Sequence, residues 1–240
     1  MTTRLAAVTS WLCAGHAAVA SAYWLLLQIP ESNAWMLAAS LLVLLIGVWL
    51  TGVVETAAML SLQADGPMRG ALAPALRRAW LIVFPLGLFA AVWWLTGAAA
   101  HWHARYAGQI DAAIIAQTGW TRTGGLHAAA GWLIAAIRWA AGLSLAAAMT
   151  AALARDGIAG LRPQWMRRGL RLRPVALTAA ALAAGVWWPW QYVYWRPAFL
   201  PPNWTQPAFA AVKLAVLFAV AQLAWAIVLW AAARERRRAD

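Results

Sequence analysis

Three charged residues lie inside long apolar stretches of the sequence, where a charge is costly to place. Arg138 lies in "GWLIAAIRWAAGLSLAAAM" (131–149), and Glu55 and Lys213 lie in two other stretches of this kind. An Arg at the centre of a bilayer costs roughly 2.5–3.5 kcal/mol on insertion scales, and ionisable residues at such positions are candidates for function by default. Arg138, Glu55 and Lys213 are therefore the candidate intramembrane site residues.

The depth of Arg138 depends on where its helix enters the hydrocarbon. If the span begins at His127, Arg138 lies about 16 Å deep, near the bilayer centre. If the boundary lies near Leu133, Trp132 and Trp139 mark the interface and Arg138 extends outward to it. We expect outward snorkelling or a bond to helix-end carbonyls, with a substrate- or partner-binding charge as the alternative.

The sequence identifies no partner for Glu55 or for His16, a fourth ionisable residue in an apolar stretch. Counted from Trp35, Glu55 differs in depth from Arg138 by about 14 Å, so a direct pair between them is not expected. His16 lies in the middle of the first apolar stretch. We interpret it as a hydrogen-bonded packing residue, with a proton relay as the alternative.

Three histidines and a carboxylate lie around the segment that follows the third apolar stretch. His101 and His103 form a His-x-His pair, Asp111 follows in the expected loop, and His127 opens the next stretch. Imidazole and carboxylate groups are ligands for zinc and copper. The His-x-His pair supplies at most two ligands, and nothing in the sequence places His127 near it, so we expect interfacial histidines and no metal site.

Signatures of familiar enzymes are absent. The chain has no His-Glu-x-x-His, no P-loop and no Gly-x-Ser-x-Gly. It has seven acidic residues and one cysteine, Cys13, which leaves few groups for carboxylate chemistry and none for an intrachain disulfide. No catalytic residue is predicted, the sequence leaves the cofactor unknown, and we favour a non-enzymatic protein over an enzyme.

The elements that carry these residues are long apolar helices. Of the 240 residues, 64% are hydrophobic and 11% are charged, compared with about 25% charged in soluble domains. About 20 apolar residues suffice to cross the hydrocarbon as a helix. We predict one all-α integral membrane domain over 1–240, a polytopic bundle with six spans at about 5–27, 34–62, 79–100, 127–154, 174–195 and 208–233.

The basic residues predict the orientation of these spans. Fourteen of them fall on one face: Arg4, Arg69, Arg77, Arg78, Arg155, Arg162, Arg167, Arg168, Arg171, Arg173, Arg234, Arg236, Arg237 and Arg238. The other face has Arg105, Arg122 and Arg196. Under the positive-inside rule both termini are cytoplasmic, and we expect a multi-pass protein of a bacterial inner membrane.

The net charge of +12 indicates lipid contact here and no nucleic acid partner, because the cations cluster in short loops between spans. The loop "RDGIAGLRPQWMRRGLRLRP" (155–174) interleaves apolar residues with arginines. We expect its basic side chains to bind anionic headgroups, or only to set topology. The headgroup-binding candidates are Arg162, Arg167, Arg168, Arg171 and Arg173.

An aromatic cluster, "VWWPWQYVYW" (186–195), ends the fifth predicted span. It could form a groove for a lipid or quinone-like ligand, or a belt of interfacial aromatics, and we favour the belt. The groove residues would be Trp187, Trp188, Trp190 and Tyr192.

Small residues recur every four positions on the fourth and fifth predicted spans. Gly142, Ala146, Thr150 and Ala154 form one such row, and Ala181 and Gly185 form another. Such rows let helix backbones approach closely. We expect them to pack within the chain, on a protein partner or in a homo-oligomer.

The segment "RGALAPALRRAWLIVFPLGLFAAVWWL" (69–95) resembles a pattern of six-helix bacterial inner-membrane proteins, such as the membrane domain attached to some glycerophosphodiester phosphodiesterases. The resemblance implies a membrane module without catalytic residues of its own. We therefore expect a transport-related or membrane-complex subunit. The alternative is a membrane-embedded enzyme or a lipid- or quinone-handling protein that uses the aromatic groove.

Overall fold

The computed structural model of the chain describes residues 2–30, 32–64, 66–121, 123–193 and 205–237. Arg122, Arg196 and Arg238, which the orientation argument used, lie outside these residues, as do positions 194 and 195 of the fifth predicted span. The described part is helical and contains no strand, which confirms the all-α prediction.

Three long helices form the main body. They are α1 (Thr2–Gln28), α2 (Ala34–Ala64) and α10 (Thr205–Arg237). Their shared core includes Val8 and Leu12 of α1, Met59 of α2, and Val228 and Leu229 of α10. Since early residues of α1 meet late residues of α10, these two helices run antiparallel.

The remaining elements pack on this body or on one another. They are α3 (Met68–Arg78), η1 (Ala79–Ile82), α4 (Val83–Thr118), α5 (Gly124–Ala136), η2 (Ile137–Ala141), α6 (Gly142–Asp156), η3 (Gly157–Gly160), α7 (Gln164–Gly169), α8 (Leu172–Leu182), η4 (Ala183–Trp187) and α9 (Trp188–Gln191). The elements η2 and η4 are single π-helical turns within otherwise continuous helices. Turns of this kind often occur at functional sites.

Five helical segments of the described chain are long and apolar enough to cross a membrane. They are Thr3–Gln28, Ala34–Ala64, Met68–Thr118, Gly124–Gly160 and Pro207–Arg236. The chain is therefore a multi-pass membrane protein. The helical stretch 172–191, which overlaps the fifth predicted span, is not among the five. Its Arg, Pro and Trp residues reduce its hydropathy, so the sixth crossing stays a prediction.

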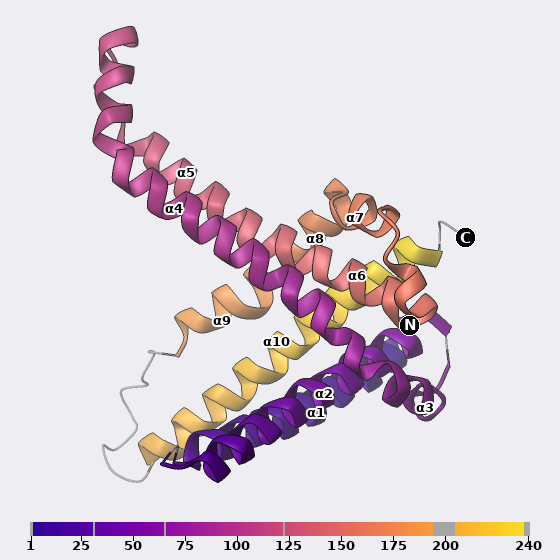
Figure 1. The fold of residues 1–240 in the computed structure, drawn as a ribbon. Helices are drawn as coiled ribbons and strands as arrows, with labels where there is room; N and C mark the ends of the chain where they lie inside the picture. Colours follow the sequence, from indigo (N-terminus) through magenta and orange to yellow (C-terminus); the bar gives the residue numbers. More distant parts are fainter. Residues whose placement is uncertain (1, 31, 65, 122, 194–204, 238–240) are drawn as a thin grey trace.

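One expected loop is largely helical. Residues 101–125 were expected to link two spans, but α4 continues without a break to Thr118. At 1.5 Å per residue its 36 residues reach about 54 Å, well beyond a hydrocarbon core of about 30 Å. The helix ends at Gly119, whose positive φ of 69° suits a residue without a Cβ. Residues 101–127, which we call the distal hairpin, thus extend from the bundle as an arm (Figure 1).

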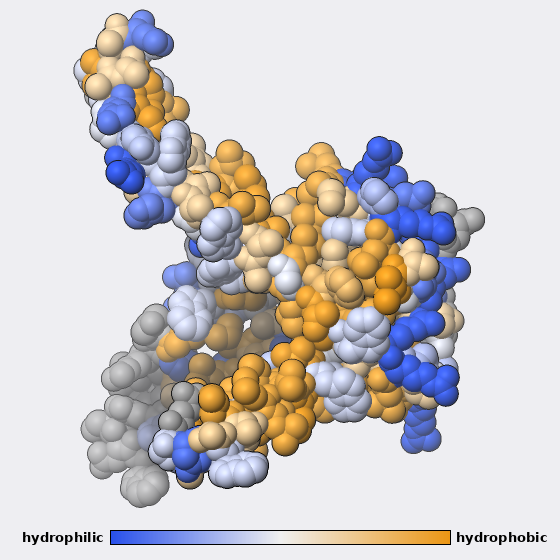
Figure 2. Space-filling view, in the orientation of Figure 1, coloured by the Kyte–Doolittle hydropathy of each residue, from blue (hydrophilic) through white to orange (hydrophobic). Residues whose placement is uncertain are grey.

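Hydrophilic side chains gather at two separate parts of the molecule. The start of α1, the end of α10, α3 and α7 all lie at one end of the bundle, which we call the basic end (Figure 1). Figure 2 shows hydrophilic side chains along this end and again on the distal hairpin, with a mainly apolar surface between them. An apolar band between two polar ends is the surface that a bilayer requires.

The predicted rows of small residues are buried within the chain. Ala146, Thr150 and Ala154 are each at most 9% exposed. A Cβ built on Gly185 would overlap the Cβ of Ala224, so α10 approaches η4 closely at this point. The small residues therefore serve packing between helices of the same chain, and a contact with a partner chain stays a prediction.

Candidate functional site

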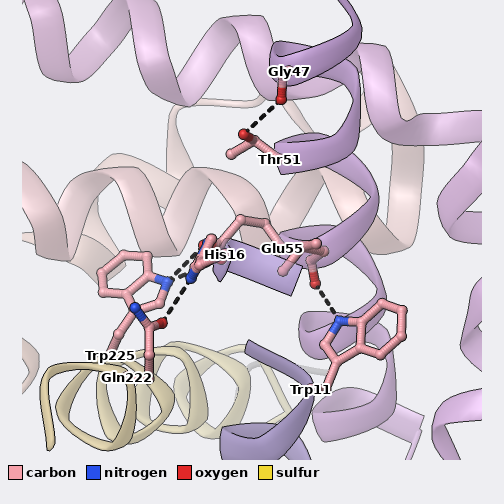
Figure 3. Close-up of polar contacts among 8 residues, drawn as sticks. Trp11, His16, Gly47, Thr51, Glu55, Gln222 and Trp225 are labelled. Carbon is pink, nitrogen blue, oxygen red and sulfur yellow. Dashed lines mark hydrogen bonds and ion pairs between the residues drawn. The ribbon is translucent and has the colours of Figure 1, made fainter. Parts of the chain in front are cut away.

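A group of polar side chains lies inside the bundle where α1, α2 and α10 meet. It consists of Trp11, His16, Glu55, Gln222 and Trp225, and we call it the polar cluster (Figure 3). Each of the three helices contributes at least one member, so the cluster forms only when the helices pack together.

Glu55 accepts hydrogen bonds from two directions. Its carboxylate oxygens lie 2.8 and 3.0 Å from Nε1 of Trp225, and Oε1 also lies 3.1 Å from Nε2 of His16. Glu55 is 7% exposed. The indole N–H and the imidazole together satisfy a carboxylate that would otherwise be costly to bury.

Both nitrogens of His16 face oxygen atoms. Nδ1 lies 2.6 Å from Oε1 of Gln222, and Nε2 faces Glu55. A neutral imidazole has a single N–H, and only the charged form donates from both nitrogens. In its protonated form His16 can therefore donate to Gln222 and to Glu55 at the same time, inside the bundle (Figure 3).

Close packing of α1 on α2 fixes the level of this pair. A Cβ on Gly15 would overlap the side chain of Val54, which is the residue before Glu55. The backbone oxygen of Val54 also accepts a hydrogen bond of 2.9 Å from Nε1 of Trp11. His16 and Glu55 directly follow Gly15 and Val54 on these two antiparallel helices, so the same contact holds them within 3.1 Å of each other.

The sequence alone does not predict this pair, because it indicates a packing role for His16 and no partner for Glu55. Gly15 meets Val54 and Gly47 meets Tyr23, so α2 is shifted along α1 by about two turns relative to a symmetric hairpin. If depth is counted in residues from the connection between α1 and α2, His16 and Glu55 therefore fall at different depths, although they are in contact. The only feature of the sequence that points to a contact between His16 and Glu55 is that both are ionisable and lie in adjacent apolar stretches.

Arg138 lies on the π-helical turn η2 and contacts α4. Its Nε donates to Oγ1 of Thr96 over 2.9 Å, and its guanidinium carbon lies 4.6 Å from the centre of the Trp93 ring. Trp139 packs edge-on against the same ring, with the ring centres 5.1 Å apart. A hydroxyl and an indole face therefore contact this cation, and the expectation that Arg138 snorkels outward or bonds to helix-end carbonyls stays a prediction.

Lys213 lies beside an apolar groove between α10 and the η4–α9 segment. The groove has a volume of about 500 Å³, and its lining includes Trp188, Tyr192, Phe209 and Lys213. Lys213 donates to the backbone oxygen of Val193 and lies over the Phe209 ring. Nε1 of Trp188 donates to the hydroxyl of Tyr192 over 3.1 Å.

Two of the four predicted groove aromatics line this groove. They are Trp188 and Tyr192, whereas Trp187 and Trp190 are exposed and are not among its lining residues. Phe209 and Lys213 come from α10, which the sequence analysis did not connect with the aromatic cluster. Only the packing of α10 against η4 brings them there.

The basic loop is partly built into the fold. Arg171 pairs with Glu235 at 3.0 Å, and Arg168 donates weakly to Gln164 at 3.4 Å. Trp165 is 7% exposed and packs among buried apolar residues, so it is not available to enter a bilayer surface. Arg162, Arg167, Arg171 and Arg173 are exposed at the basic end, among the exposed apolar side chains of Ile158, Met166 and Leu170.

The distal hairpin brings together three of the four residues considered as metal ligands. His127 contacts His103 and Asp111, one through each ring nitrogen, whereas His101 is exposed. Asp111 lies on α4 and not in a loop. These three residues meet because α4 continues as a helix to Thr118, where the sequence predicts an irregular connection over 101–125.

Comparisons of the chain with protein family models, with curated proteins and with solved structures give no match.

Proposed function

We propose that the chain is a non-enzymatic protein of the bacterial inner membrane, with six spans and both termini in the cytoplasm, that acts as a transport-related subunit. The observation that carries the proposal is the buried His16–Glu55 pair at the junction of α1, α2 and α10. Ionisable residues inside a membrane bundle typically face its interior, pair with one another and mark ion pathways or proton relays.

The pair can hold a proton in two positions. In the first, Nε2 of His16 carries it and Glu55 is a carboxylate; in the second, the proton has crossed the 3.1 Å gap to Oε1 and both groups are neutral. Neither state has a net charge, so the transfer avoids placing an uncompensated charge in the bilayer. Glu55 accepts from Trp225 and His16 contacts Gln222, so the transfer changes two contacts with α10.

The charge distribution supports the proposed orientation. The basic side chains of α3, α7 and the end of α10 lie at the basic end (Figure 2). Because short cytoplasmic loops are enriched in Arg and Lys, this end belongs in the cytoplasm and the distal hairpin on the other side.

Proton flux into proteoliposomes tests the proposal. The purified chain, with any protein that remains bound in mild detergent, is reconstituted around a pH-sensitive dye, and a membrane potential is imposed. We expect flux with the wild-type chain and its loss in His16→Gln and Glu55→Gln. Thr51→Ala is the matched control, because Thr51 lies one turn from Glu55 and bonds within its own helix. Absence of flux together with absence of any stoichiometric protein partner by mass spectrometry would refute the proposal.

A second candidate function, lipid or quinone handling, is favoured by the groove between η4–α9 and α10. An aromatic-lined apolar groove of about 500 Å³ has the size of small-molecule sites. We expect organic extraction of the purified protein to release one lipid or quinone per chain. Trp188→Ala should reduce this amount, whereas Trp94→Ala, which alters an exposed Trp of α4, should not. Equal release from both variants would contradict this function.

A further inference from the structure

Two imidazoles face each other across the distal hairpin. Nε2 of His103, on α4, lies 3.1 Å from Nδ1 of His127, on α5. On the far side of its ring, His127 donates from Nε2 to Oδ1 of Asp111 over 2.7 Å. A neutral His127 has its single N–H on Nε2, which leaves the lone pair of Nδ1 directed at His103.

We propose that His103 and His127 bind one divalent transition-metal ion, such as Zn²⁺, and that Asp111 orients His127 for this role. Two imidazole nitrogens that bind one tetrahedral zinc at 2.0–2.1 Å lie about 3.3 Å apart. The observed separation is 3.1 Å, so the two nitrogens already lie at nearly the required distance, and binding requires the rings to tilt until both lone pairs point at the ion. On binding, the N–H of neutral His103 shifts from Nε2 to Nδ1, so that both histidines bind the ion as neutral imidazoles.

Asp111 has the geometry of a residue that supports a metal-binding histidine. Histidines that bind metal almost always donate their other N–H to a carboxylate, carbonyl or water, which fixes the tautomer and raises the basicity of the ligand. The 2.7 Å hydrogen bond between Nε2 of His127 and Oδ1 of Asp111 holds the proton of His127 on Nε2 and leaves Nδ1 free to bind the ion.

The chain supplies two ligands, and water completes the coordination. Among the described residues, no three His, Cys, Asp or Glu side chains are grouped so that all of them could hold a metal ion. Imidazole ligands suit zinc, copper and nickel. His127 is 25% exposed and Asp111 32%, so an ion and its waters can reach the site from solvent. The site is independent of the proposed transport function, because it lies on the distal hairpin and not in the polar cluster.

Zinc titration of the full-length protein tests the proposal. The protein is purified in detergent with a tag that contains no histidine, treated with a chelator and titrated with ZnCl₂ in a calorimeter. We expect one site per chain in the wild type and its loss in His103→Gln and His127→Gln. Asp111→Asn should weaken binding by about 10–100-fold. His101→Gln is the matched control, because His101 belongs to the same His-x-His pair but is exposed, and it should bind as the wild type does.

Cobalt absorption gives a readout that does not depend on the folding of the histidine variants. Co²⁺ added to the wild-type protein should produce visible bands of nitrogen coordination, and one equivalent of Zn²⁺ should remove them. The proposal is overturned if the wild type shows neither these bands nor a calorimetric site. It is also overturned if His101→Gln loses as much zinc binding as His103→Gln, because the histidines then bind zinc only as independent surface groups.

Discussion

At the scale of the residue, each of the three intramembrane charges contacts a different set of partners. Glu55 meets an imidazole and an indole N–H, Arg138 meets a hydroxyl and an indole face, and Lys213 meets a backbone carbonyl and a phenyl ring. Neutral partners leave a charge in place, whereas the ionisable partner His16 lets a proton move. This difference makes Glu55, and not Arg138 or Lys213, the centre of the proposed transport function.

The coupling between His16 and Glu55 should be measurable in a double-mutant cycle. Glu55→Gln leaves an imidazolium unmatched in the bundle, and breaking a buried ion pair on one side costs about 3–5 kcal/mol. The double variant with His16→Gln should recover a large part of that loss, because no charge is then left behind. Unfolding in mixed detergent micelles measures the four free energies. If the two single effects simply add, His16 and Glu55 do not act as a pair.

Arg138 should depend on Thr96 in a similar way. Thr96→Ala removes the acceptor of the Nε hydrogen bond, and a hydrogen bond to a charged group contributes about 1.5–3 kcal/mol. In an Arg138→Leu background the same Thr96→Ala change should cost much less, because no guanidinium remains to be satisfied. The same detergent unfolding experiment compares the two backgrounds, and an equal cost in both would show that Thr96 acts only within its own helix.

At the scale of the element, close approaches between helices determine which side chains meet. Gly15 lets α1 approach Val54 of α2, and Gly185 lets η4 approach Ala224 of α10. The first approach aligns His16 with Glu55, and the second closes one side of the groove at Trp188 and Lys213. Two glycines at helix contacts therefore shape both candidate sites without contributing a side chain to either.

The contact at Gly185 makes a compensation experiment possible. Gly185→Ala should destabilise the protein by about 1–3 kcal/mol, the usual cost of overpacking a tight contact. Adding Ala224→Gly should recover much of this loss, because it removes the Cβ that the new methyl group would overlap. Gly87→Ala is the control: a Cβ at that position has open space, so this change should not destabilise the helix. Failure of Ala224→Gly to compensate would show that α10 and η4 do not approach as described.

At the scale of the whole molecule, the fold separates two polar regions by an apolar band (Figure 2). The basic end includes the start of α1 and the end of α10, and the distal hairpin lies away from it (Figure 1). The polar cluster lies inside the bundle, where α1, α2 and α10 meet, and not on the α4–α5 arm. The candidate metal site lies on the distal hairpin, so the two sites contact different surroundings.

The orientation of the molecule should appear in cysteine labelling of intact cells. With Cys13 replaced by Ala, single cysteines are placed at Gly70 and Arg162 of the basic end and at Ala116 of the distal hairpin, all of them exposed positions. An impermeant maleimide should label position 116 and leave 70 and 162 unlabelled until the cells are opened. Labelling of 70 and 162 without 116 would reverse the proposed topology.

The sequence alone determined the class of the molecule. Long runs of apolar residues with few charges have a single physical outcome, helices that cross a bilayer, and that prediction needed no knowledge of which helix lies beside which. The arginines predict an orientation for the same reason, because the rule depends on the loops between spans and not on their packing. Local composition is enough to predict the membrane-crossing helices and their orientation, because both depend on residues close together in the sequence.

Only the tertiary structure decided which side chains meet. His16 and Gln222 are 206 positions apart, and Glu55 and Trp225 are 170 apart, so no local pattern could join them. His103 and His127 meet because α4 continues through the expected loop and α5 returns along it. The register between two helices depends on close approaches such as that of Gly15 to Val54. Each approach needs a small residue on one helix and a side chain that fits it on the other. In the bilayer, apolar side chains are as well accommodated by lipid as by protein, so hydrophobic pattern cannot specify that register, and packing at small residues does.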